Sequence, residues 1–124
     1  MAGETTMDFD DSALAGLKDA LPGAEFRDLL TDYLESTAAR MAKVQILRAT
    51  QNWNDLAFEA HTLVSTGGSY GLVRASTLAR SLQHACKAGD AEQASMLALE
   101  LIAATARGCE ALRSRFLGDR AAAA

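Results

Sequence analysis

The chain has 124 residues, about half of them apolar, with few aromatic residues, one proline and a formal net charge of −4. This length fits one domain with its own core, and a composition rich in alanine and leucine favours helices over sheets. The acidic balance argues against a nucleic-acid binder, which needs a basic surface. Because no apolar run has transmembrane length and the acidic start of the chain lacks the features of a signal peptide, we expect no membrane association and a cytoplasmic location.

The beginning of the chain predicts a leader and one short helix. We expect residues 1–8 to be a flexible leader. Asp10 or Asp11 can cap a helix that ends before Pro22-Gly23. This helix is too short to be stable alone, so we expect it to lie across the end of a larger bundle.

Four longer segments follow, at about 24–50, 53–66, 72–88 and 91–117, and each has apolar residues three and four positions apart. Asn52 and Asp90 are expected to cap the helices that begin near 53 and 91. The short connections between the segments imply antiparallel neighbours. The sequence therefore predicts an all-α fold, an antiparallel up-down-up-down four-helix bundle with an extra short N-terminal helix. We expect a single bundle domain over 9–118 and a flexible tail over 119–124.

One histidine is predicted to lie on the outer face of the 53–66 helix. At 100° per residue, His61 falls about 130° from the centre of the apolar stripe of that helix. Its predicted neighbours on the outer face are Asn54, Phe58 and Ser65. We expect three glycines to end the helix and allow a tight reversal, at Gly67, Gly68 and Gly71.

The stretch from His61 to Gly71 resembles the phosphorylation motif of histidine-containing phosphotransfer (HPt) domains, His-x-Leu-Lys-Gly-Ser-small-Gly-x-aromatic/aliphatic-Gly. The matching or similar positions are His61, Leu63, Thr66, Gly67, Gly68, Tyr70 and Gly71. Two positions depart from it, because Val64 stands where the family has lysine and Ser65 where it has glycine. The resemblance extends in register over most of residues 24–117, although only the motif is specific.

The resemblance implies a phosphocarrier and not an enzyme, with His61 as the phosphoacceptor. Histidine suits this role because a ring nitrogen keeps a free lone pair near neutral pH. The implied partners are the receiver domain of a response regulator and a hybrid or sensor histidine kinase, in a two-component phosphorelay. The chain itself would hold no cofactor, since in this family the receiver domain supplies the Mg2+ ion and the reacting aspartate.

Other polar residues form the predicted phosphoryl environment. Small residues near the histidine, Ser65 and Gly68 among them, leave room for an in-line approach of the phosphoryl group. Gln83 can hydrogen-bond the ring nitrogen that is not phosphorylated, or it is an ordinary surface glutamine. Arg80 or Lys87 can replace the charge missing at Val64, or both are solvated surface cations.

The predicted docking surface for the partner consists of Phe58, Asn54 and Val64. An exposed phenylalanine one turn before His61 suggests contact with an apolar partner surface, and the alternative is that a neighbouring helix covers it. We expect Tyr70 to pack under the turn and His84 to have no role. We expect no metal site, because His84, Cys86 and Cys109 fall on different faces, and both cysteines fit small buried side chains in a reducing compartment.

Three alternatives to phosphocarriage remain. The departures at Val64 and Ser65 are also compatible with a phosphorylation-deficient module that docks a receiver or kinase without transfer. A chance motif would leave a plain helical adaptor, and a bundle enzyme would need paired carboxylates or metal ligands that the sequence lacks. We expect a monomer.

Overall fold

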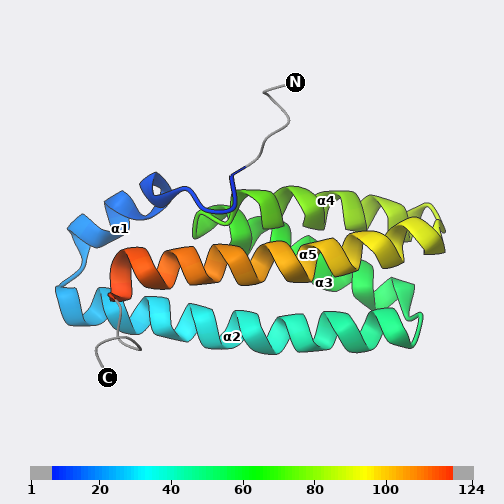
Figure 1. Ribbon diagram of the computed structural model, residues 1–124, viewed down its shortest axis with the longest axis horizontal. Coiled ribbons are helices and arrows are strands. Elements are labelled where there is room, and N and C mark those ends of the chain that lie inside the picture. Colours follow the sequence, from blue (N-terminus) through cyan, green and yellow to red (C-terminus); the bar gives the residue numbers. More distant parts are fainter. Residues whose placement is uncertain (1–6, 119–124) are drawn as a thin grey trace.

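The computed structural model describes residues 7–118, and within them every element is helical, which confirms the all-α prediction. The long helices lie side by side, and a short helix lies across one end of them (Figure 1). The short elements are η2 (Asp11–Leu14), α1 (Ala15–Ala20) and η3 (Arg113–Leu117). The long helices are α2 (Gly23–Ala49), α3 (Trp53–Ser69), α4 (Val73–Lys87) and α5 (Ala91–Leu112).

The four long helices enclose one core, and each packs against its neighbours in the order α2, α3, α4, α5 and back to α2. Connections of three residues at 50–52, 70–72 and 88–90 reverse the chain between consecutive helices (Figure 1). Burying a large aliphatic side chain stabilises a fold by about 1.5–3 kcal/mol, and this core contains many of them. The largest apolar side chains that are fully buried are Leu14, Leu30, Leu56, Leu72, Leu82, Leu101, Leu112 and Val44.

The predicted helix starts and stops are confirmed where side chains cap them. The side chain of Asn52 accepts a hydrogen bond from the Asp55 backbone N–H, as the capping-box pattern predicts. Gly89 takes a positive φ of 75° after α4, and Asp90 then caps α5 by accepting from the Gln93 N–H. Among the described residues, no helix is long and apolar enough to cross a bilayer.

The N-terminal segment is fixed to the bundle at the turn between α3 and α4. Asp10 N donates to the Gly71 carbonyl at 2.7 Å, and the Asp8 carboxylate pairs with Arg107 of α5 at 3.0 Å. Asp10 caps η2, so the short helix begins as predicted, although its first turn is a 3-10 helix. Residues 1–6 of the predicted leader and the tail at 119–124 lie outside the described residues.

One predicted helix end is wrong, and the last helix reaches its predicted end at residue 117 with a change of helix type. The third segment does not stop at residue 66, because α3 continues through Gly67 and Gly68 to Ser69, and of the three glycines only Gly71 forms the turn. Gly71 has a φ of 84°, where a Cβ atom would also collide with the Asp10 backbone. The last segment is α-helical only to Leu112, and η3 continues it to residue 117 as a π-helix.

Candidate functional site

His61 lies on the solvent-facing side of α3, near the middle of the helix, as its spacing from the apolar stripe predicts. Residues three, four and seven positions away share its face, because an α-helix repeats every 3.6 residues. Phe58, Ser65 and Gly68 occupy such positions, and all three are exposed. Phe58 is 70% exposed, so no neighbouring helix covers it.

Gln83 of α4 is the side chain that contacts the histidine ring. Its Nε2 atom lies 3.2 Å from His61 Nδ1, across the line of contact between α3 and α4. Nδ1 is the ring nitrogen in this contact, and Nε2, on the other edge of the exposed ring, does not contact Gln83. The two helices therefore hold the imidazole in one orientation with its far edge toward solvent.

Close packing of α3 on α4 explains why these two residues meet. Gly67 is buried, and a Cβ atom at this position would lie 3.4 Å from the Ser76 Cβ atom and backbone of α4. The Ser76 hydroxyl donates a hydrogen bond to the Val64 carbonyl of α3 at 2.7 Å. Gly67 thus acts in helix packing, and the small exposed residues on the face of His61 are Ser65 and Gly68.

The remaining predicted residues lie on the same two helices. Arg80 and Lys87 are exposed on α4, three residues before and four after Gln83, so they share its face. On α3, Asn54 is exposed and Val64 is half-buried. The predicted site residues therefore form two adjacent rows, one on α3 and one on α4.

Behind this surface, α3 is joined to α2 by a buried carboxylate. Glu59 is 4% exposed, and its two oxygens accept from Arg40 at 2.7 Å and Lys43 at 2.9 Å. Burial acts to raise the pKa of Glu59, but the hydrogen bonds and positive charges of the two cations outweigh it, and the pKa is lowered overall. Glu59 therefore carries a negative charge at neutral pH and fixes the inner side of the helix that bears His61.

Other residues considered from the sequence lie away from His61. Tyr70 stacks on Tyr33 of α2, with ring centroids 3.9 Å apart, and so packs against the bundle as predicted. Cys86 is buried and Cys109 half-buried, and burial raises the pKa of each thiol, so both stay neutral. His84 is exposed on α4. Within residues 7–118 no group of three or more metal-ligating side chains comes together.

Sequence reasoning missed three residues that position the site. Ser76 and Gly67 set the spacing of α3 and α4, and Glu59 ties α3 to α2. A signal for Glu59 was present, because it falls next to Ala60 on the inner half of the helix, where an acidic residue needs a cationic partner. No comparable signal marks Ser76, because its partner is a backbone carbonyl of another helix.

Comparison with known proteins gives one match, to a family model described as Hpt domain, over residues 28–115. Neither the curated proteins nor the solved structures include a match to this sequence. The matched segment is more than half of the chain and includes all of α3 and α4, and with them His61 and Gln83.

Proposed function

Because the chain belongs to the Hpt domain family, whose members are histidine phosphotransfer modules of phosphorelays, we propose that it carries a phosphoryl group on His61. The observation that carries this proposal is the exposed imidazole of His61, which Gln83 of the neighbouring helix holds by Nδ1 at 3.2 Å. An oriented nucleophile with an open approach is what in-line transfer requires.

The proposed reaction is a reversible exchange between His61 and an aspartyl phosphate of a receiver domain. The lone pair of His61 Nε2 attacks phosphorus, the bond from phosphorus to the aspartate oxygen breaks, and the carboxylate leaves with that electron pair. The proton on Nδ1 is then released to solvent. The receiver supplies the Mg2+ ion that balances the charge of the phosphoryl oxygens, so this chain provides the nucleophile and its orientation. It acts as a phosphocarrier without a catalytic cycle of its own.

Gln83 suits both states of the ring. After transfer Nδ1 is unprotonated, and it can accept a hydrogen bond from the Gln83 Nε2–H group, which faces it at 3.2 Å in the structure. Before transfer, Nδ1 must hold the proton so that Nε2 has a free lone pair, and a carboxamide rotated by 180° presents its oxygen to accept that N–H. We expect Gln83→Ala to slow transfer about 10-fold, and Gln83→Glu, which only accepts, to slow the return from phosphohistidine more than its formation.

Arg80 and Lys87 are proposed to supply the charge that lysine would supply at Val64. Close approach of Gly67 to Ser76 and of His61 to Gln83 sets the antiparallel register of α3 and α4. In that register Arg80 lies at the level of Val64, one turn from the histidine, and Lys87 lies one turn to the other side. Two cations on α4 therefore bracket the ring, where they favour a negatively charged phosphoryl group.

The partner is proposed to dock over the exposed part of α3. Phe58 offers an apolar anchor one turn before His61, with Asn54 one turn before Phe58 and the half-buried Val64 one turn after His61. The occupant would be a receiver domain, or the kinase that delivers the phosphoryl group. A monomeric protein in the cytoplasm would meet both partners by diffusion.

A docking module without transfer is the second candidate, and the valine at position 64 and the serine at position 65 favour it. One experiment separates the two: incubation with a panel of phosphorylated receiver domains, comparing the unchanged protein with His61→Gln. His84→Gln is the matched control, since His84 is the only other histidine of the chain and is also exposed. Acid-labile label that is lost with His61→Gln and kept with His84→Gln supports the carrier. Receivers that bind without labelling the unchanged protein support docking alone.

A further inference from the structure

Residues 7–10 precede the first helix without being helical themselves, and we call them the strap (Figure 1). Two backbone hydrogen bonds hold the strap to the turn between α3 and α4. The Asp10 N–H donates to the Gly71 carbonyl at 2.7 Å, and the Met7 carbonyl accepts from the Arg74 N–H at 3.1 Å. The strap is therefore bonded both to the turn and to the first residues of α4.

Side chains of the strap also reach α5 and the segment that follows it. The Asp8 carboxylate pairs with Arg107 of α5 at 3.0 Å, and the Phe9 ring meets the Phe116 ring edge-on, with centroids 6.2 Å apart. The ion pair is weak, because the side chains of Asp8 and Arg107 are 34% and 54% exposed and water screens their charges. A segment with few buried contacts can detach at a lower free energy than the whole domain unfolds.

The first turn of α4 depends on the strap for part of its hydrogen bonding. Leu72 occupies the cap position of α4 and has no side-chain acceptor, so the first N–H groups of the helix need other partners. The Met7 carbonyl is the partner of the Arg74 N–H. In the same turn, the Ser76 hydroxyl donates to the Val64 carbonyl of α3 at 2.7 Å. One turn of α4 is thus bonded both to the strap and to α3.

The contact between α4 and the histidine lies along the same two helices. Val64 follows His61 by one turn of α3, and Gln83 follows Ser76 by two turns of α4. Gln83 Nε2 lies 3.2 Å from His61 Nδ1, a contact that requires α4 to keep its register on α3. Because hydrogen bonds and rigid helices carry energetic coupling between distant groups, loss of the strap contact at the start of α4 is expected to weaken the contact at Gln83.

We propose that the strap is a latch that controls the orientation of His61. When docked, the strap holds the first turn of α4 against α3 and so keeps Gln83 on the imidazole. When released, it frees that turn, and the imidazole loses its fixed orientation. An event that pulls the strap away therefore slows phosphotransfer. This last consequence rests on the proposed function of His61, whereas the coupling between the strap and the imidazole does not.

NMR spectroscopy of the full chain tests the latch. Asp8→Asn/Phe9→Ala removes both side-chain contacts of the strap and should speed hydrogen exchange of the Arg74 amide about 10-fold. The ring nitrogen signals of His61 should then move toward their positions in Gln83→Ala, the variant that reports the imidazole without its partner.

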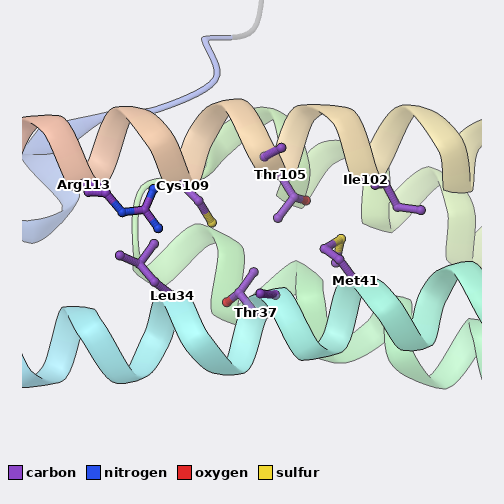
Figure 2. Close-up of a pocket in the computed structure, with 9 residues that line it drawn as sticks. Leu34, Thr37, Met41, Ile102, Thr105, Cys109 and Arg113 are labelled. Carbon is purple, nitrogen blue, oxygen red and sulfur yellow. The ribbon is translucent and has the colours of Figure 1, made fainter. Parts of the chain in front are cut away.

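Single variants separate the latch from a general loss of stability. Arg107→Gln removes the ion pair from the α5 side and should produce the same changes at a smaller size. Ile102→Ala is the matched control for Phe9→Ala, because Ile102 is also a half-buried apolar side chain but lines the groove between α2 and α5 (Figure 2). It should lower the unfolding free energy and leave the His61 signals in place, and His84, exposed on α4, is the internal reference.

The proposal is overturned if Asp8→Asn/Phe9→Ala leaves the exchange of the Arg74 amide unchanged, or speeds it without moving the His61 signals. It is equally overturned if Ile102→Ala moves those signals as far. All of these measurements use unphosphorylated protein, so their outcome does not depend on whether His61 carries a phosphoryl group in a phosphorelay.

Discussion

Glu59 forms ion pairs with Arg40 and Lys43, and we predict that removing the carboxylate and removing the two cations change the free energy of unfolding by different amounts. Glu59 is 4% exposed, whereas the side chains of Arg40 and Lys43 are 35% and 59% exposed. When Glu59→Gln removes the negative charge, both cations return to water. The loss is then the two charge-assisted hydrogen bonds, reduced by solvent screening, or about 1–2 kcal/mol of unfolding free energy.

Removing the cations instead leaves the carboxylate buried without a partner. Breaking a buried pair in this way costs about 3–5 kcal/mol. Protonation limits the loss, because neutralising a carboxyl group with an ordinary pKa near 4.3 costs about 3.7 kcal/mol at pH 7. We therefore expect the Arg40→Met/Lys43→Met variant to lose about 3–4 kcal/mol of unfolding free energy, more than Glu59→Gln loses.

The contribution of Glu59 to the pH dependence of the unfolding free energy should also have opposite signs in the unchanged protein and in the Arg40→Met/Lys43→Met variant. In the unchanged protein the pKa of Glu59 is lowered, so its contribution is present above the unfolded pKa and is lost as pH falls through the folded pKa. In the Arg40→Met/Lys43→Met variant only burial remains, which raises the folded pKa of Glu59. That variant should gain stability as pH falls from 7 to 5, because protonation then favours the folded state.

Urea unfolding followed by far-UV circular dichroism at pH 7 and pH 5 measures both effects. The triple variant Arg40→Met/Lys43→Met/Glu59→Gln is the control, since its difference from the double variant isolates the titration of Glu59. The reasoning is refuted if the double variant loses no more stability than Glu59→Gln. It is equally refuted if the double and triple variants respond to pH in the same way.

Four further predictions concern the turns, helix contacts and helix caps, and urea unfolding measures the change in stability for each. Gly71→Ala should destabilise by about 2 kcal/mol or more, because φ is 84° and the added Cβ atom would meet the Asp10 backbone. Gly68→Ala, inside α3, should stabilise by about 0.5–1 kcal/mol, because the added Cβ atom would make only an ordinary contact with Ser76 Oγ at 3.8 Å. Ser76→Ala should cost about 1 kcal/mol and shift the imidazole NMR signals of His61, whereas Ser76→Thr should retain both. Asn52→Ala should cost about 1 kcal/mol through loss of the α3 cap.

Local features of the sequence were sufficient to predict the helices and several of their ends. The spacing of apolar residues places His61 on the outer face, and the structure shows that residue exposed. Asn52 and Asp90 cap their helices as predicted, because a cap depends on residues within one turn of each other. The extension of α3 through Gly67 and Gly68 was missed because glycine lowers helix propensity by only about 1 kcal/mol, which packing against α4 outweighs.

The contacts between helices were decided by tertiary structure. The sequence made Gln83 a candidate neighbour of His61, but only the register of α3 on α4 brings the two side chains to 3.2 Å. That register depends on a buried glycine and a serine hydroxyl from different helices, Gly67 and Ser76. Periodicity within one helix carries no information about either.

The sequence by itself thus determined that the chain forms amphipathic helices, that one of them carries an outward histidine, and that the motif around it resembles a phosphotransfer site. Tertiary structure alone decided that Glu59 is buried between two cations and that the Thr105 hydroxyl is buried without a hydrogen-bond partner. The reason is physical: helix formation and exposure follow from side chains three and four residues apart. Ion pairs and cavities depend on how surfaces distant in the sequence fit together.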